Sequence, residues 1–99
     1  MLNWSVYLLV DPRAGAIRYV GQTRYPRDRM IGHISEDTPA TRMWINGLKR
    51  DGLRPEMRIV QTSLGSSSAA REAEIKWILA MRAQGCSLLN FVRLTCAPI

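Results

Sequence analysis

Cysteine, histidine and long apolar runs are scarce in this 99-residue chain. The two cysteines, Cys86 and Cys96, form no CxxC pair, and His33 is the one histidine. These counts exclude a cysteine-rich zinc module and a disulfide framework. No apolar run approaches the roughly 18 residues of a membrane span. The apolar segment 4–10 lacks a preceding basic flank, so it does not resemble a signal peptide. We therefore expect a reduced, cytoplasmic setting without a membrane partner.

Acidic residues and lysine are scarce as well. Eight Asp and Glu stand against 14 Lys and Arg, which gives a formal net charge of +6. Only Lys49 and Lys76 are lysines, so arginine carries the excess. The planar arginine fork holds phosphate oxygens with two hydrogen bonds, whereas lysine acts as a point charge. The excess thus favours a polyphosphate partner, although general solubility or a GC-rich genome would also produce it.

The length predicts one domain over residues 1–99, and the apolar patterning predicts its class. The expected strands cover residues 4–10, 17–21 and 57–62, with turn residues 11–16 between the first two. The expected helices run from Pro26 to about Ser35, from Pro39 to near Gly52, and from about Ala69 to Gln84, where Gly85 ends the last one. Segment 87–92 is expected to be extended. The order β-β-α-α-β-α predicts an α+β fold with a small three-stranded antiparallel sheet flanked by helices.

A carboxylate interrupts the apolar face of the helix expected at 69–84. A rotation of about 100° per residue places one apolar stripe on it. Its members are Ala70, Ala73, Trp77, Ile78 and Met81. Glu74 falls in the middle of this stripe, whereas Glu72 falls on the far side near Lys76. An unpaired carboxylate there costs several kcal/mol. Two explanations remain open: an ion pair with an arginine of another element, or a metal-binding or catalytic carboxylate that faces a cleft.

Two tyrosines are expected on the first hairpin. A turn centred near Arg13 brings Tyr7 and Tyr19 within one register step of each other, and a slip of one residue would turn them to opposite faces. A packed cross-strand pair and a shared site both remain open. Arg29 and His33 are four residues apart, so they share a face of the next helix.

Arginine is concentrated between positions 13 and 29. This run holds five arginines: Arg13, Arg18, Arg24, Arg27 and Arg29. A solvated basic face is the usual meaning of such a run, and a phosphate-binding surface is the alternative. Tyr25 lies within the run and could stack on an exposed base, as could Trp44, although apolar neighbours favour core packing for Trp44.

Taken in order, these residues resemble a known family. Val6-Tyr7, Tyr19-Val20-Gly21, Arg29, His33, Glu74 and Asn90 resemble the motifs of the GIY-YIG nuclease domain, over about residues 5–90. Segment 72–78 is similar to the nuclease domains of phage and mobile-element enzymes. The first motif departs from the pattern, because Ser5 stands where the family has glycine. The tyrosine of that motif is retained.

The resemblance implies a phosphodiester-hydrolysing endonuclease that acts on nucleic acid, with DNA as the expected substrate, and uses one Mg²⁺ or Mn²⁺ per site. It implies that Glu74 binds the metal and that Arg29 braces the scissile phosphate. Tyr7 is the candidate general base or water-orienting group, and Tyr19 would hold the water or a phosphate oxygen. His33 would assist or act as base in place of Tyr7. The expected supporting residues are Gly21 and Asn90, and the expected substrate-binding residues are Arg13, Arg18, Arg24 and Arg27.

Two other classes remain open at this point. The chain could be a catalytically inactive nucleic-acid-binding module on the same fold. It could also be a small structural domain with a buried Glu-Arg pair, which predicts no salt-dependent binding of DNA. A monomer is the default expectation.

Overall fold

The structure is a computed structural model, and it describes residues 3–35 and 39–90, without the side chains of residues 33–35. The described residues form strands β1 Trp4–Asp11, β2 Ala16–Thr23 and β3 Glu56–Leu64. They also form helices α1 Pro26–Ser35, α2 Pro39–Arg50 and α3 Ser67–Ala83. The predicted α+β fold and its β-β-α-α-β-α order are confirmed. None of these helices has the length and apolar character that crossing a membrane requires.

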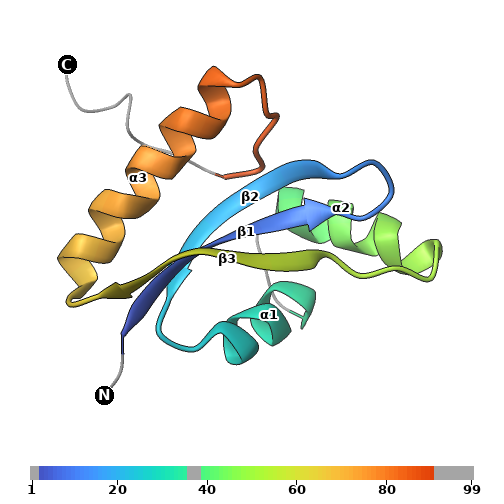
Figure 1. Cartoon of the computed structure of the whole chain (residues 1–99). Helices are drawn as coiled ribbons and strands as arrows, with labels where there is room; N and C mark the ends of the chain where they lie inside the picture. The colour runs from blue at the N-terminus through green and yellow to red at the C-terminus, as the bar shows by residue number, and fades with distance from the viewer. Residues whose placement is uncertain (1–2, 36–38, 91–99) are drawn as a thin grey trace.

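The three strands form one antiparallel sheet in the order β2-β1-β3. Helix α3 covers one face of the sheet, and α1 and α2 lie on the other (Figure 1). The central strand β1 is therefore buried on both faces, which explains why its sequence is a nearly continuous apolar run. Alternate side chains of β1 enter two separate clusters.

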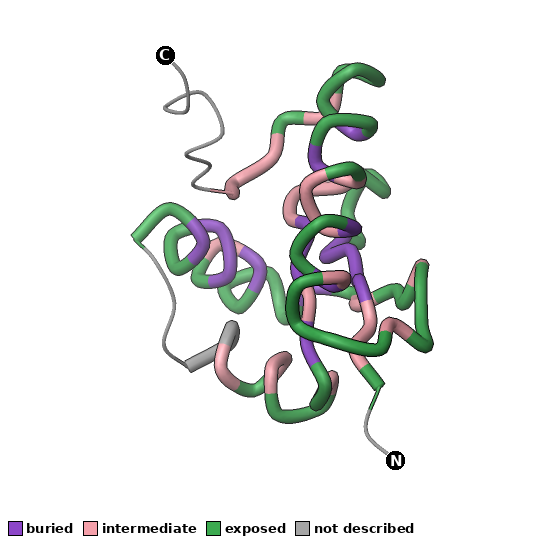
Figure 2. Tube along the Cα trace, turned by 90° about the vertical axis from the view of Figure 1, so that its left-hand side faces the viewer, coloured by how far each residue is buried: buried purple, intermediate pink, exposed green. Residues whose placement is uncertain are grey.

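The cluster beneath α3 joins this helix to the central strand. Val6, Leu8 and Val10 of β1 pack against Ala73, Ile78 and Met81 of α3. The opposite cluster joins Tyr7 and Leu9 to Trp44, Ile45 and Leu48 of α2. Figure 2 shows these buried positions along the strands and along the helix faces nearest to them. The described part of α1, residues 26–32, holds no fully buried residue.

Helix boundaries follow local rules. Helix α1 begins at Pro26, whose fixed φ suits the first helical position, and the Tyr25 carbonyl accepts a hydrogen bond of 2.9 Å from the Arg29 amide. Helix α3 is capped by the Ser66 hydroxyl, which accepts from the Ala69 amide at 3.1 Å. It ends before Gly85, which adopts φ 89°. Beyond it, residues 87–90 form no strand, and positions 91 and 92 of the expected extended segment lie outside the described residues.

The first hairpin contains a bulge that sets its register. Tyr7 lies opposite Gly21 and Leu9 lies opposite Tyr19, but Val10 lies opposite Ile17. Arg18 is thus the extra residue on β2. Tyr7 and Tyr19 are diagonal neighbours on one face rather than a directly opposed pair. The register therefore places Tyr7 and Tyr19 on the same face of the sheet, a point that the sequence left open.

An ion-pair cluster closes the turn of this hairpin. The Arg13 guanidinium donates to both carboxylate oxygens of Asp11, at 3.0 and 2.8 Å, and to Asp51 at 3.1 Å. The Trp44 indole donates to Asp11 at 3.0 Å, within the buried part of the cluster. These hydrogen bonds, that from the Arg13 side chain above all, hold the pKa of Asp11 well below its usual range. The cluster fastens α2 and the following turn to the hairpin.

Acid should therefore weaken the fold through Asp11. A carboxyl whose pKa is lower in the folded state stabilises the protein above its unfolded pKa of about 4, and this contribution is lost as pH falls. We expect Asp11→Asn to lower the unfolding free energy at pH 7 by about 1–3 kcal/mol and to flatten its decline between about pH 5 and 2. Denaturant titrations across this range measure both effects. Glu56→Gln, which removes an exposed carboxylate paired with Arg58, should change little, and an unaltered acid slope in Asp11→Asn would contradict the argument.

Candidate active site

Four side chains from four elements interact through a ring contact, a hydrogen bond or their charges. Tyr7 comes from β1, Tyr19 from β2, Arg29 from α1 and Glu74 from α3. The two tyrosine rings are stacked, with centroids 6.3 Å apart and planes inclined by 28°. The charges of Arg29 and Glu74 both act on the Tyr7 hydroxyl, to which Arg29 also hydrogen bonds. Residues separated by up to 67 positions in the chain therefore share one electrostatic environment.

Tyr7 lies at the centre of this group and is fully buried. Burial and the neighbouring Tyr19 raise the pKa of Tyr7 well above its usual value, and Glu74 adds to this effect. Arg29 opposes the rise through its positive charge and its hydrogen bond. The net result is a phenol that stays protonated at neutral pH, and such a group donates a hydrogen bond more readily than it accepts a proton.

Gly21 makes the position of Tyr7 possible. A Cβ placed on Gly21 would overlap with the Tyr7 hydroxyl and would lie 2.8 Å from its Cε2 atom. The Tyr7 ring thus rests directly on the backbone of β2, opposite Gly21 in the register. A side chain at this position would force the ring away from the site.

Glu74 lies half-buried on α3, between the buried positions Ala73 and Ile78. Burial raises the pKa of its carboxyl, while the charges of Arg71 and Arg29 lower it. Within residues 3–35 and 39–90, no ion pair involves Glu74. The ion-pair explanation that the sequence left open has no counterpart in this part of the chain. The carboxylate is therefore a desolvated negative charge beside Arg29 and is suited to a cation.

The donor set around Glu74 is small. The described residues contain no group of three His, Cys, Asp or Glu side chains that could hold a metal ion. A site with one carboxylate suits Mg²⁺ or Mn²⁺ better than Zn²⁺, because Mg²⁺ usually keeps several waters and takes one or two carboxylates.

Asn90 braces the strand that carries Tyr19 and Gly21. Its side chain accepts from the Val20 amide at 2.8 Å and donates to the Val20 carbonyl at 2.6 Å. The Leu89 amide donates to the Arg18 carbonyl at 2.6 Å. Because β2 is an edge strand, these bonds satisfy backbone groups that the sheet leaves open. The segment after α3 thereby holds the edge of the site in place.

The other four arginines of the basic run at positions 13–29 lie in different parts of the structure. Arg13 is held by Asp11 and Asp51 at the hairpin turn. Arg18 is half-buried at the bulge, and its Nε atom has no hydrogen-bond partner. Arg24 packs on two aromatic rings after β2, and Arg27 is exposed on α1. His33 follows Arg29 by one turn of α1, but its side chain is outside the described part of the chain.

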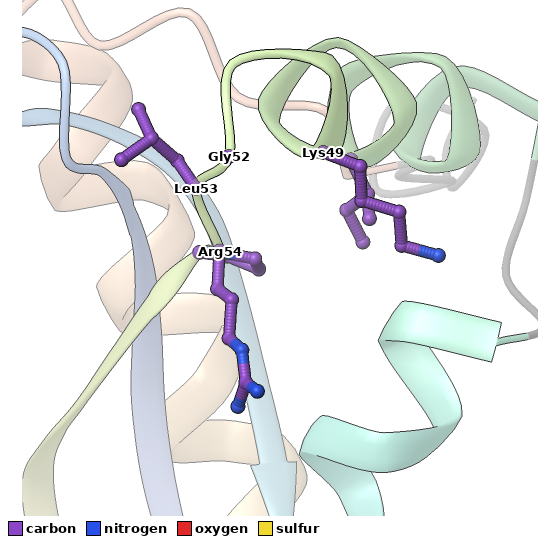
Figure 3. A pocket seen from close by; sticks show the side chains of 6 residues that line it. Lys49, Gly52, Leu53 and Arg54 are labelled. Atoms are coloured by element: carbon purple, nitrogen blue, oxygen red, sulfur yellow. The ribbon is translucent and has the colours of Figure 1, made fainter.

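A pocket of about 410 Å³ lies where α2 leads into β3. Tyr7, Tyr19, Arg29 and Glu74 do not line it. Figure 3 shows Lys49 and Arg54 on its two sides, with Leu53 between them in the chain. None of the site residues predicted from the sequence lines it. No pattern in the sequence singles out Trp4, one of the two rings beneath Arg24. The pairing of Ser5 with Thr23 brings Trp4 beside Arg24, and this becomes visible only once the register is known.

A family model described as the GIY-YIG catalytic domain matches residues 3–87. Searches of curated proteins and of solved structures found no significant match. The matched range includes Tyr7, Tyr19, Arg29 and Glu74.

Proposed function

Because this chain belongs to the GIY-YIG family of nuclease domains, we propose that it is an endonuclease that hydrolyses phosphodiester bonds of DNA with the help of one divalent metal ion. The observation that carries the proposal is the half-buried carboxylate of Glu74 without an ion pair in the described chain, beside Arg29 and the stacked tyrosines. A phosphodiester is anionic and resists attack, so its hydrolysis requires charge neutralisation and a positioned water. This group of side chains offers both.

Glu74 would hold the metal, and Mg²⁺ or Mn²⁺ fits its single hard oxygen donor group. When bound, the ion supplies positive charge that stabilises the phosphate oxygens and lowers the pKa of nearby water. Protons compete for the same carboxylate, and burial raises the pKa of Glu74. Metal affinity should therefore decline as pH falls, and this decline should begin at a higher pH than for an exposed glutamate.

The chain's own residues divide the remaining work. Arg29 binds a phosphate oxygen through its charged donors and stabilises the charge that grows there during attack. Tyr7, whose phenol stays protonated in this environment, orients the attacking water by hydrogen bonding. Tyr19 holds the same water or a second phosphate oxygen. His33 is our candidate for accepting the proton of the water, because an imidazole titrates near neutral pH.

A cleavage panel tests this proposal directly. Purified protein is incubated with single-stranded DNA, duplex DNA, branched DNA and RNA, each with Mg²⁺, Mn²⁺ or EDTA. We expect cleavage of DNA with either metal and none with EDTA. The alternative, an inactive nucleic-acid-binding module, predicts binding that weakens as salt rises but no cleavage under any condition. A structural domain predicts neither. The absence of cleavage throughout the panel would therefore refute the proposed function.

A further inference from the structure

Trp4, Arg24 and Tyr25 form a surface cluster where β2 leads into α1. The central carbon of the Arg24 guanidinium lies 5.5 Å from the centroid of the Trp4 ring and 5.5 Å from that of Tyr25. One Arg24 nitrogen also donates to the Tyr25 hydroxyl at 3.2 Å. Tyr25 is 47% exposed. The cluster thus presents a guanidinium at the surface that is oriented by two aromatic side chains.

Aromatic rings rather than carboxylates lie beside the Arg24 guanidinium. Arg13 and Arg58 are neutralised by carboxylates at 2.8 and 2.7 Å. No ion pair of the described chain involves Arg24, whose guanidinium instead contacts the two aromatic side chains. A guanidinium held by rings keeps donors directed to solvent, where they can hold a phosphate with two bonds.

The cluster is fixed to the backbone that carries the candidate site. Thr23, which is buried, accepts a hydrogen bond of 2.9 Å from the Tyr25 amide. The Tyr25 carbonyl accepts from the Arg29 amide at 2.9 Å. One helical turn, about 5.4 Å of rise, therefore separates the cluster from Arg29. Figure 1 shows this junction between the end of β2 and α1, beside the start of β1. A nucleic-acid strand with one phosphate at Arg29 would pass close to the cluster.

We propose that the Trp4–Arg24–Tyr25 cluster binds an unpaired nucleotide next to the scissile phosphate, so that the substrate is a nucleic acid with unpaired bases at the cut site. Arg24 holds the backbone phosphate, and Tyr25 stacks on the base. In a duplex the base faces are already stacked on one another, so an aromatic ring reaches them only where the strand is unpaired. The proposal rests on the proposed function for the location of the scissile phosphate. The binding preference itself requires no catalysis.

Equilibrium binding in EDTA tests the preference without cleavage. Fluorescence anisotropy is measured with labelled single strands of about 15 nucleotides, as DNA and as RNA, and with the same DNA strand annealed to its full complement as a blunt duplex. We expect Tyr25→Leu to weaken binding of at least one single strand about tenfold and that of the duplex less than twofold. Tyr25→Phe keeps the ring and should bind like the wild type. Arg24→Gln should weaken binding of single strands and duplex alike, because both present phosphates.

Arg58→Gln is the charge-matched control, since Arg58 is exposed on β3 at the opposite edge of the sheet. Thermal melting confirms that each variant is folded. Equal weakening of single strands and duplex in Tyr25→Leu, or no weakening, would overturn the proposal. Cleavage is measured separately from binding, so a failure of the proposed function can be distinguished from a failure of this inference. A Tyr25-dependent preference without cleavage would refute the nuclease and retain only the binding of an unpaired nucleotide, and cleavage without that preference would retain the nuclease and refute the inference.

Discussion

Glu74→Gln is expected to reduce metal-dependent cleavage by at least about a hundredfold while leaving the protein folded and able to bind nucleic acid. Glutamine has the shape of glutamate but no charge, so it can neither attract a divalent cation nor balance its charge. The substitution also removes a half-buried negative charge that has no ion pair within the described residues. The unfolding free energy should therefore stay the same or rise slightly. Loss of function without loss of stability identifies a functional carboxylate.

Glu72 provides the matched control. It is exposed on the same helix, two residues earlier, and its side chain points away from the apolar stripe. Glu72→Gln changes the net charge by the same amount and should leave cleavage, stability and binding unchanged. The measurements are initial cleavage rates with Mg²⁺, anisotropy with a labelled oligonucleotide, and denaturant unfolding. Equal rates for the two variants would remove Glu74 from the metal site.

Helix periodicity was sufficient to single out Glu74 because the period of a helix fixes which residues share a face. The stripe it predicts contains the residues that the structure buries on α3, namely Ala70, Ala73, Ile78 and Met81. The order of the elements along the chain and the fold class were predictable for a similar reason, since alternation and turn residues depend on local sequence. Gly85 likewise ends α3 as expected.

Features that depend on register or on contacts between distant segments could not be predicted. The relation between Tyr7 and Tyr19 depends on the bulge at Arg18, which no local pattern indicates. The basic run seemed to be one surface because its members are close in sequence. Arg13 instead pairs with Asp51, 38 residues away, and Arg24 packs on Trp4. Charge composition does not determine which carboxylates or rings each arginine meets in the folded protein.

The close contact between Gly21 and Tyr7 gives the second large expected effect. Gly21→Ala places a methyl group where the Tyr7 ring now lies, although the backbone of Gly21 has no positive φ and would itself accept alanine. The Tyr7 ring is fully buried and cannot turn aside without repacking its neighbours. We expect a loss of about 1–3 kcal/mol in unfolding free energy. Displacing the hydroxyl by about 1 Å should also reduce cleavage about a hundredfold.

A double variant separates this clash from other effects of the methyl group. Tyr7→Leu removes the ring, so Gly21→Ala should cost much less stability in that background than in the wild type. A coupling of about 1–2 kcal/mol between the two substitutions, measured by denaturant unfolding, is expected for residues in direct contact. Cleavage should remain lost in the double variant, because the hydroxyl is gone. Gly47→Ala on α2 is the matched control: its added Cβ would meet only the end of the Arg50 side chain, at 3.8 Å, and helix propensity favours alanine. If the two substitutions act additively, the ring contact is not what requires glycine at position 21.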